Sequence, residues 1–161
     1  NRHYTVQDFL EIITKVKNKN PSLTLSTDFI CGFPGETEEK FENSIKIIQK
    51  IRPDIINISK YYPRPKTKAR HQKNHPSTQV KERTKKMTTL TRKISQENNQ
   101  RWISWTGEII IDEIGKNNTW VGRNFAYKPV VIKSQIIQLG SNINITIKKA
   151  FSTYLEGQAQ N

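Results

Sequence analysis

The hydrophobic pattern of this chain changes its period near residue 99, and this change constrains the fold more than any other feature of the sequence. Before that point, apolar residues at helical spacing alternate with short β-branched stretches, in the order helix, strand, helix, strand. Beyond it, the sequence holds short β runs separated by Gly, Asn and Pro. The pattern therefore predicts an α/β part followed by a small all-β part.

Residues 1–76 are predicted to form part of a parallel α/β sheet or barrel. Two helices are expected, one with Thr5 and one with Thr37 as its N-cap. Two buried strands are expected, one at residues 23–30, a short β-branched and apolar stretch, and one at residues 55–59. The second is continuous in apolar character, which is typical of strands in a parallel sheet. Two strands cannot close a barrel, so we expect an N-terminal part of the barrel that this sequence does not contain.

Residues 77–98 are predicted to form a polar helix that starts at Ser77 and connects two domains, because its apolar stripe is narrow. Residues 99–161 hold about five short β runs, which favours a small closed or partly open barrel of the OB-like class. Asn117 and Asn118 lie between two of these runs. Since Asn tolerates positive φ, they predict a tight hairpin turn there.

Positive charge is concentrated in one segment. The chain carries a net charge of +13, and residues 60–93 hold twelve Lys and Arg against Glu82 alone, a net +11. Residues 1–59 are neutral, and residues 94–161 carry a net +2. One interpretation is a solvated, lysine-rich face. The other, which the concentration in one segment favours, is a surface that attracts a polyanion, of which nucleic acid is the commonest in the cytoplasm.

The single cysteine, Cys31, limits the chemistry that the chain can carry. It cannot form a disulfide within the chain, which suits the cytoplasm, and it cannot supply the set of thiolates that an iron–sulfur cluster needs. We expect it to be a core residue of a strand. The three histidines lack zinc-ligand spacing, so no metal site is expected. No apolar run approaches the ~20 residues that span a bilayer, so no membrane partner is expected.

The segment 27–37, Thr-Asp-Phe-Ile-Cys-Gly-Phe-Pro-Gly-Glu-Thr, leaves a predicted strand, passes two glycines and enters a helix. Such a junction lets a ligand approach the backbone closely. The segment resembles the signature of the radical-SAM tRNA methylthiotransferase family. Further stretches resemble the same family in the same order, at residues 1–5, 56–67 and 81–84, and the last β part resembles its TRAM domain, a small RNA-binding barrel.

The resemblance, which is strongest to the archaeal and eukaryotic branch, implies a function for the full-length protein. That branch converts N6-threonylcarbamoyladenosine at tRNA position 37 to its 2-methylthio derivative, with S-adenosylmethionine and two 4Fe–4S clusters as cofactors. The cluster cysteines of the family lie in an N-terminal part that is not present here, so we expect this chain alone to be inactive. That part could belong to the same chain or to a separate subunit. The alternatives are a branch acting on isopentenyladenosine or on a ribosomal protein, and a stand-alone RNA-binding module without catalytic activity.

The resemblance also places residues around the cofactor, although it assigns no catalytic residue and no metal ligand to this chain. Arg2 is a candidate for binding the cofactor carboxylate or a substrate phosphate, because a guanidinium suits either. The alternative to cofactor binding is core packing for the other candidates and an ordinary surface charge for Arg2. The predicted cofactor-binding residues are Arg2, Asp28, Ile30, Gly32, Phe33, Tyr61 and Tyr62.

A second group is predicted to bind the anticodon stem-loop of tRNA, with no DNA partner expected. Basic residues that alternate past two prolines would follow a phosphate track if the segment is extended. The β part has more aromatic residues than a small core needs. Trp120 is the one most expected in the core, while others are candidates to stack on unpaired bases. The predicted RNA-binding residues are Arg64, Lys66, Lys68, Arg70, Lys85, Lys86, Arg123, Phe125, Tyr127 and Lys128.

Overall fold

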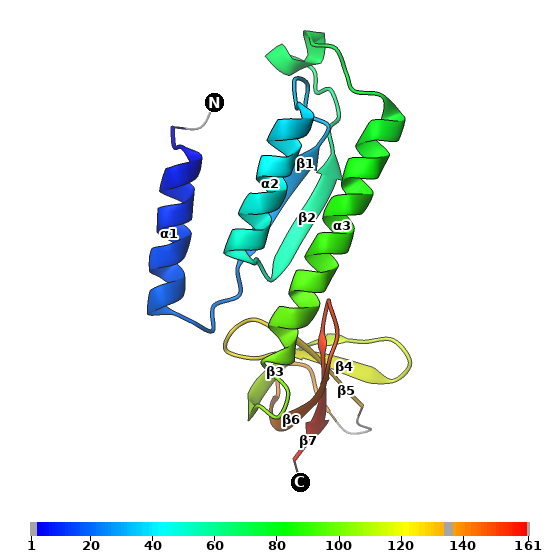
Figure 1. The fold of residues 1–161 in the computed structure, drawn as a ribbon. Helices are drawn as coiled ribbons and strands as arrows, with labels where there is room; N and C mark the ends of the chain where they lie inside the picture. The colour runs from blue at the N-terminus through cyan, green and yellow to red at the C-terminus, as the bar shows by residue number, and fades with distance from the viewer. Residues whose placement is uncertain (1–2, 134–136, 161) are drawn as a thin grey trace. The chain divides into compact units, whose positions relative to one another are not determined.

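The computed structural model describes residues 3–133 and 137–160 (Figure 1). The chain divides into two compact units. The α/β unit is Leu25–Ile94, and the barrel unit combines residues 1–24 with residues 95–161. The division falls within one helix, and the predicted domain boundaries at residues 76 and 98 stay a prediction.

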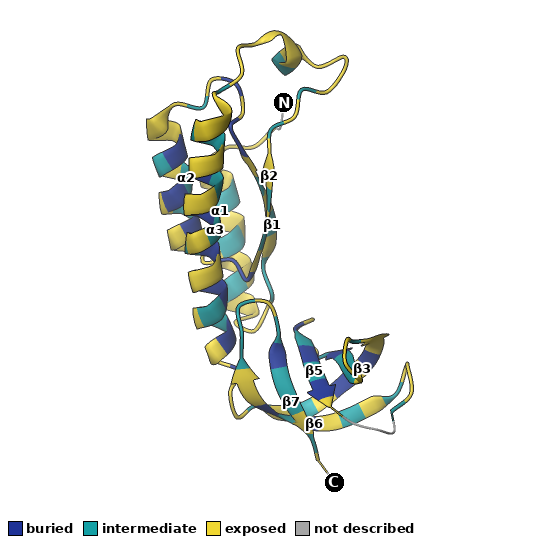
Figure 2. Ribbon diagram, turned by 90° about the vertical axis from the view of Figure 1, so that its right-hand side faces the viewer, coloured by how far each residue is buried: buried dark blue, intermediate teal, exposed yellow. Residues whose placement is uncertain are grey.

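The α/β unit is built on two parallel strands. Their register runs from Ser26 opposite Ile55 to Cys31 opposite Lys60, so the predicted parallel pairing is confirmed. Figures 1 and 2 show two helices covering the same face of this strand pair. The elements are β1 (Ser26–Cys31), α2 (Glu38–Ile51), β2 (Ile55–Lys60), the 3₁₀ helix η1 (Lys68–His71) and α3 (Ser77–Gln100), whose last turns lie beyond this unit.

Local sequence explains the bounds of α2. The side chain of Thr37 accepts a hydrogen bond from Lys40 N at 3.2 Å, as expected of an N-cap. Arg52 adopts a left-handed conformation with φ 44°, and Pro53 follows, so the helix ends there. One face of α2 is buried, as the helical spacing of its apolar residues predicts, and consists of Phe41, Ile45, Ile48 and Ile51.

The predicted burial of both strands is wrong. Along β1 and β2, exposed residues alternate with more buried ones, and Ile30 and Ile55 are 50% and 40% exposed. Figure 2 draws both strands mostly in teal and yellow. The reason is that helices cover one face of the strand pair within this unit, whereas a continuously apolar run suggests cover on both faces.

Helix α3 begins at Ser77 as predicted and ends two residues beyond the predicted end. Within the α/β unit, Met87 and Ile94 of its apolar stripe are fully buried, with 0% and 2% exposure. Buried polar residues, Arg83 and Thr91, accompany them. None of the described helices is long and apolar enough to cross a membrane.

The barrel unit begins with α1 (Val6–Lys19), where Thr5 and Asp8 form a capping box, as the sequence predicts for its N-cap. Five strands close into a barrel in the order β3-β4-β5-β7-β6, which confirms the predicted small barrel. The strands are β3 (Thr106–Ile114), β4 (Thr119–Arg123), β5 (Pro129–Lys133), β6 (Asn142–Ala150) and β7 (Leu155–Ala159).

The inward side chains of the strands form the barrel core. The predicted turn is confirmed, since Asn117 and Asn118 have φ values of 54° and 57° between β3 and β4. The expectation for Trp120 is wrong: this residue is half-buried at the edge of the core, and Trp102 is the tryptophan that the core encloses, with 4% exposure. The rest of the buried core is Ile109, Ile111, Ala126, Val130, Ile132, Ile145, Ile147 and Leu155.

Candidate cofactor-binding face and nucleic-acid interface

The face of β1 and β2 turned away from the helices gathers two of the predicted cofactor residues. Asp28 and Ile30 lie two residues apart, so both point to this exposed face. The parallel register places Asn57 opposite Asp28 and Ser59 opposite Ile30. Asn57 Nδ2 donates a hydrogen bond to Asp28 Oδ1 at 2.9 Å. The face therefore presents a carboxylate, an amide, a hydroxyl and an aliphatic side chain together.

Asn57 and Ser59 were missed in the sequence. Both lie in the stretch 56–67 that resembles the family, but the resemblance assigned them no role, and the run 55–59 was interpreted as a continuously apolar, buried strand. Combining side-chain alternation with a parallel register would have found them, because residues opposite Asp28 and Ile30 must share their face.

Aromatic side chains collect where the strands end. Phe33, just after β1, packs edge-on against Tyr61, just after β2, with ring centroids 5.2 Å apart. The hydroxyl of Tyr61 is buried and has no hydrogen-bond partner among the described residues. Tyr62 is 78% exposed, and Phe33 is 47% exposed. Rings that are partly open to solvent, beside a buried hydroxyl without a partner, could contact an adenine or another flat ligand.

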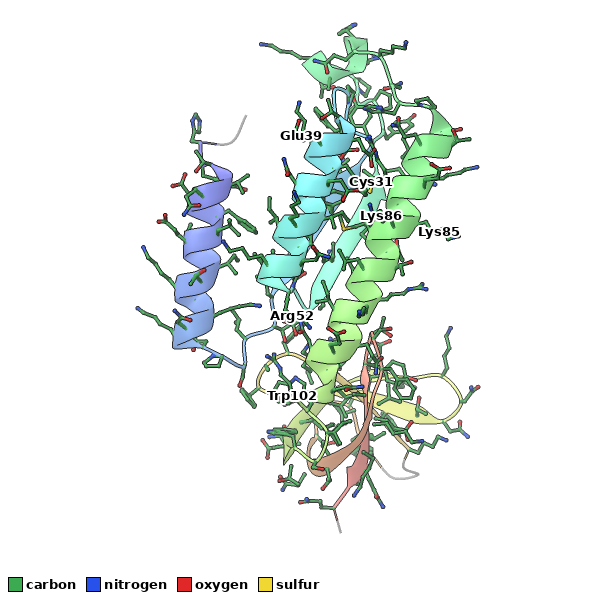
Figure 3. The ribbon with its side chains drawn as sticks, in the orientation of Figure 1. Cys31, Glu39, Arg52, Lys85, Lys86 and Trp102 are labelled. Atoms are coloured by element: carbon green, nitrogen blue, oxygen red, sulfur yellow. The ribbon has the colours of Figure 1, made fainter. Side chains whose placement is uncertain are left out.

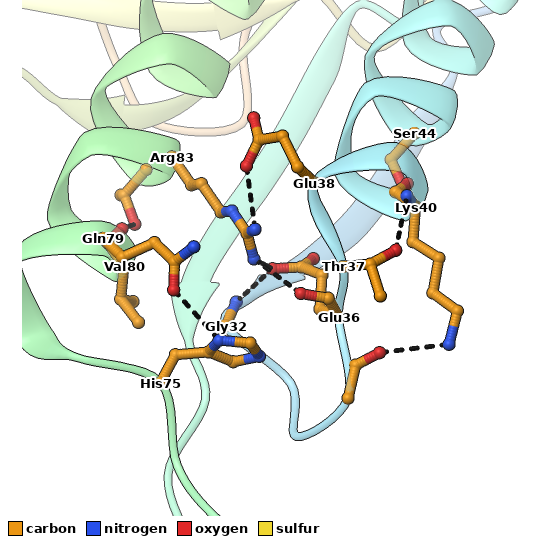
Figure 4. Close-up of polar contacts among 12 residues, drawn as sticks. Gly32, Glu36, Thr37, Glu38, Lys40, Ser44, His75, Gln79, Val80 and Arg83 are labelled. Atoms are coloured by element: carbon orange, nitrogen blue, oxygen red, sulfur yellow. Dashed lines mark hydrogen bonds and ion pairs between the residues drawn. The ribbon is translucent and has the colours of Figure 1, made fainter.

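The turn after β1 explains why Gly32 must be glycine. Its φ is +78°, and a Cβ atom there would lie 2.6 Å from Val80 Cγ2 of α3. Its backbone N–H donates to Glu36 Oε2 at 2.9 Å (Figure 4). Packing and turn geometry therefore account for this glycine without a ligand.

Arg83 holds this turn in place, a role that was not predicted from the sequence. It is 4% exposed, and its Nη1 donates to Glu36 Oε2 at 2.8 Å and to the Glu36 carbonyl at 2.9 Å. Its Nη2 donates to Glu38 Oε2 at 2.9 Å (Figure 4). Burial opposes the charge, but the hydrogen bonds to Glu38 and Glu36 outweigh it and raise the pKa of Arg83. The same Glu36 carboxylate thus joins Gly32 to Arg83.

Cys31 is fully buried, as expected of a core residue. Burial raises the pKa of its thiol, and Glu36 raises it further. A hydrogen bond with Thr84 and the charge of Arg83 lower the pKa of the thiol, but burial outweighs both. A protonated, enclosed thiol is a poor nucleophile and a poor metal ligand. The described residues contain no group of His, Cys, Asp and Glu that could hold a metal ion.

The basic residues after β2 are exposed, but the segment is not extended as predicted. A turn at residues 65–66, where Lys66 has φ 63°, and η1 over residues 68–71 interrupt it. The four side chains therefore do not alternate along a straight track. None of them forms an ion pair with a residue that the structure describes; they are Arg64, Lys66, Lys68 and Arg70.

Two further predicted RNA contacts, Lys85 and Lys86, are exposed neighbours on α3 that differ in their partners (Figure 3). Lys86 forms an ion pair with Glu42 of α2, and its ammonium lies 5.8 Å from the centre of the Phe41 ring. Lys85 points away from α2. Of the two, Lys85 presents the charge that no described acidic residue offsets.

The candidates in the barrel unit have different surroundings. Phe125 and Tyr127 are 73% and 67% exposed, and Arg123 pairs with Asp112 at 2.8 Å. Lys128 contradicts the expectation of a phosphate contact. It is 3% exposed, and its ammonium donates to Asn99 Oδ1 at 2.9 Å, because the side chain points inward from the loop. Arg2, the remaining candidate, lies outside the described residues.

Comparison with known proteins shows which proteins this chain is similar to. No protein-family model matches it. It is 37% identical over 157 residues to a probable threonylcarbamoyladenosine tRNA methylthiotransferase of Archaeoglobus fulgidus, and 40% identical over 157 residues to a protein of the same name from Pyrococcus abyssi. Each alignment covers 98% of this chain and 36% of the relative. The chain is homologous to part of the tRNA methylthiotransferases. The resemblance seen in its sequence is thereby confirmed.

A relative named for a different substrate matches nearly as well. The tRNA-2-methylthio-N(6)-dimethylallyladenosine synthase of Caldicellulosiruptor saccharolyticus is 35% identical over 160 residues, covering 98% of this chain and 34% of the relative. The chain spans about a third of the length of the curated relatives it matches.

Proposed function

We propose that this chain is the portion of a tRNA methylthiotransferase that lines one side of the S-adenosylmethionine pocket and binds the tRNA. The observation that carries the proposal is the 37–40% identity, over 98% of the chain, with archaeal relatives of that name. The reaction would convert N6-threonylcarbamoyladenosine at position 37 to its 2-methylthio derivative. The somewhat lower identity to the dimethylallyladenosine synthase supports this branch over the other.

The cofactor side of the proposal rests on the exposed face of β1 and β2. In a complete barrel with its helices outside, this face would line the interior, where parallel barrels bind ligands near the carboxyl ends of their strands. Bound S-adenosylmethionine supplies the radical chemistry of this enzyme class. Around it, Asp28 would accept hydrogen bonds, Ile30 and Phe33 would contact its apolar parts, and the buried Tyr61 hydroxyl would find the partner that it lacks among the described residues. Gly32, Tyr62 and Arg2 complete the proposed set.

The residues present do not fit an iron–sulfur cluster. A cluster needs several thiolates, whereas Cys31 is the single cysteine and is a buried thiol with a raised pKa. We therefore assign both 4Fe–4S clusters to an N-terminal part, in the same polypeptide or in a partner subunit. Without that part, this chain would bind its ligands but not complete the reaction.

The RNA side of the proposal rests on two features. The closed five-stranded barrel has the architecture of small oligonucleotide-binding barrels, which supports its assignment as a TRAM domain. The exposed basic residues after β2 and Lys85 would contact the phosphates of the anticodon stem-loop. The cytoplasmic location expected from the sequence follows from this partner.

The experiment that tests this function is mass spectrometry of tRNA nucleosides from the source organism, with and without the gene. We expect 2-methylthio-N6-threonylcarbamoyladenosine to disappear when the gene is removed and its unmethylthiolated precursor to accumulate. Loss of a methylthiolated isopentenyladenosine would assign the chain to the other branch. An unchanged nucleoside profile would contradict the proposal.

A stand-alone RNA-binding module is the second candidate. The observation that favours it is the closed five-stranded barrel, an architecture that oligonucleotide-binding proteins use without any catalytic part. It predicts tRNA binding by the chain together with an unchanged nucleoside profile, so the same pair of measurements separates the two functions.

A further inference from the structure

The loop that joins β4 to β5 points its side chains alternately inward and outward. Asn124, Ala126 and Lys128 are 5%, 8% and 3% exposed, whereas Phe125 and Tyr127 between them are 73% and 67% exposed. Two aromatic rings thus project into solvent from a loop whose other three side chains are enclosed. Single exposed apolar residues are common, but this regular alternation is not explained by core packing.

The inward residues fix the loop from three directions. Asn124 Oδ1 accepts from the backbone N–H groups of Ala126 at 3.1 Å and Lys128 at 2.9 Å. The Lys128 ammonium donates to Asn99 Oδ1, and Asn99 Nδ2 donates to the carbonyl of Phe151 at 2.7 Å. The loop is therefore tied to the end of α3 and to the connection after β6.

A third tie comes from the segment after α1, where the Thr24 hydroxyl donates to the carbonyl of Ala126. Tyr127 has φ +61°, a strained conformation for a residue with a side chain, and its N–H bonds to the carbonyl of Asn124 at 2.8 Å. Strain of this kind persists when surrounding contacts impose it, and it is concentrated at binding sites.

The two outward rings are also held in orientation. Phe125 packs edge-on against Trp102 with centroids 5.8 Å apart and lies 6.1 Å from the ring of Trp105. The guanidinium of Arg123 lies 4.8 Å from the centre of the Tyr127 ring, and Asp112 fixes that guanidinium. Rings positioned in advance lose little conformational freedom when a ligand stacks on them.

Charge indicates which part of a nucleic acid would bind here. Residues 94–161 carry a net +2 only, and the ammonium of Lys128 is buried. The phosphate backbone is attracted chiefly by exposed positive charge, so this loop offers little to a duplex. Exposed aromatic faces next to an arginine are what unpaired RNA bases stack on.

We propose that the β4–β5 loop is a pre-formed stacking platform for two unpaired RNA bases, one on Phe125 and one on Tyr127, with Lys128 as its positioning residue. This rests on the proposed function only in that the RNA is taken to be a tRNA with an unpaired anticodon loop. The platform would hold bases by stacking, with almost no dependence on salt, and Lys128 would act through the loop without touching the RNA.

The test compares two RNAs of equal phosphate number, an anticodon stem-loop and a fully paired duplex, by fluorescence polarisation across a salt series. The chain is measured with Phe125→Leu and Tyr127→Leu, which keep an apolar side chain but remove the ring face. We expect about a tenfold loss of stem-loop affinity for each ring removed, the size of one base–aromatic stack. Duplex affinity and the slope of log K against log salt should stay unchanged.

Two further variants serve as controls, and a third tests the positioning role of Lys128. Ile114, the last residue of β3, is an apolar side chain that is 64% exposed. Ile114→Ala should leave the affinities for both RNAs unchanged. Tyr127→Phe keeps the ring and should bind as the unaltered chain does. Lys128→Met, checked for folding by circular dichroism, should weaken stem-loop binding without altering the salt slope, whereas a phosphate contact would lower the slope by about 1.

The outcomes distinguish failure of the proposed tRNA binding from failure of the stacking platform. If the unaltered chain binds neither RNA, the proposed tRNA function fails. If it binds the stem-loop but the leucine variants bind equally well, the platform is overturned and the exposed rings are a contact for another protein. If stem-loop and duplex affinities fall together with a reduced slope, the loop contacts phosphate and the stacking proposal is also overturned.

Discussion

The basic segment 60–93 of the α/β unit and the β4–β5 loop of the barrel unit present different chemistry to the RNA that we propose as ligand. The segment 60–93 concentrates a net +11, and its cations after β2 form no ion pair within the described structure. Residues 94–161 carry a net +2 but expose two aromatic rings on a rigid loop. Phosphates are attracted by the first arrangement and unpaired bases by the second. The contrast teaches that net charge alone would have located only half of the proposed interface.

The contrast depends on separating cations that stabilise the fold from cations that face solvent. The largest effect on the free energy of unfolding is expected for Arg83, which is of the first kind. Arg83→Met would leave the largely enclosed Glu36 carboxylate without its cationic partner, and removing one member of a buried ion pair costs about 3–5 kcal/mol. The free energy of unfolding, measured in urea, should fall by that amount. Lys81→Met on the exposed side of the same helix is the matched control and should change it by less than about 0.5 kcal/mol. Equal, small effects would make Arg83 one more surface cation.

A smaller loss of unfolding free energy is expected from substitutions in the turn after β1, which Arg83 supports. Gly32→Ala would place a Cβ 2.6 Å from Val80 Cγ2 and would also strain a φ of +78°, so we expect a loss of about 2–3 kcal/mol in unfolding free energy. Gly35→Ala has a similar φ of +80° but meets nothing within 4 Å, so about 1 kcal/mol is expected. Urea unfolding of both variants measures the difference. If Val80→Ala does not partly rescue Gly32→Ala, close packing is not the reason for this glycine.

Local chemistry allowed much of the fold to be predicted. Thr37 begins α2, and Asn117 and Asn118 form the hairpin turn, because capping and positive φ depend on a few adjacent residues. Strand burial could not be predicted in the same way. The exposed face of β1 and β2 mixes Ile30 and Ile55 with polar residues, and whether that face is covered depends on segments that the strands themselves do not encode.

The candidate site could also be predicted only in part, because some of its residues are brought together by tertiary structure. Asp28 and Ile30 share one face as the motif suggested, but Asn57 and Ser59 join them only through the strand register. Lys128 looked like a phosphate contact because its charge is visible in the sequence. Its partner Asn99 is 29 residues away, so the hydrogen bond that turns the side chain inward is a property of the tertiary structure alone.

The last prediction tests the contrast between the units directly and should leave the stability of the chain unchanged. Replacing Lys66, Lys68 and Arg70 by Gln removes three exposed cations that have no acidic partner in the described structure. Each cation that contacts a phosphate releases counterions, so the slope of log K against log salt for stem-loop binding should flatten by about 1 per lost contact, about 3 in all. Duplex RNA should lose affinity alongside the stem-loop, because both present phosphates.

The Phe125→Leu and Tyr127→Leu variants of the barrel unit should give the opposite result. They should lose affinity for the stem-loop but not for the duplex, and the slope of log K against log salt should stay unchanged. Combining the two sets of substitutions extends the test. If the basic segment and the platform contact different chemical groups of the same RNA, their free-energy losses should add, since sites without shared partners behave independently. A slope that stays unchanged in the Gln variant would remove the basic segment from the RNA interface. The charge of this chain would then serve solubility, and stacking on the barrel would carry recognition by itself.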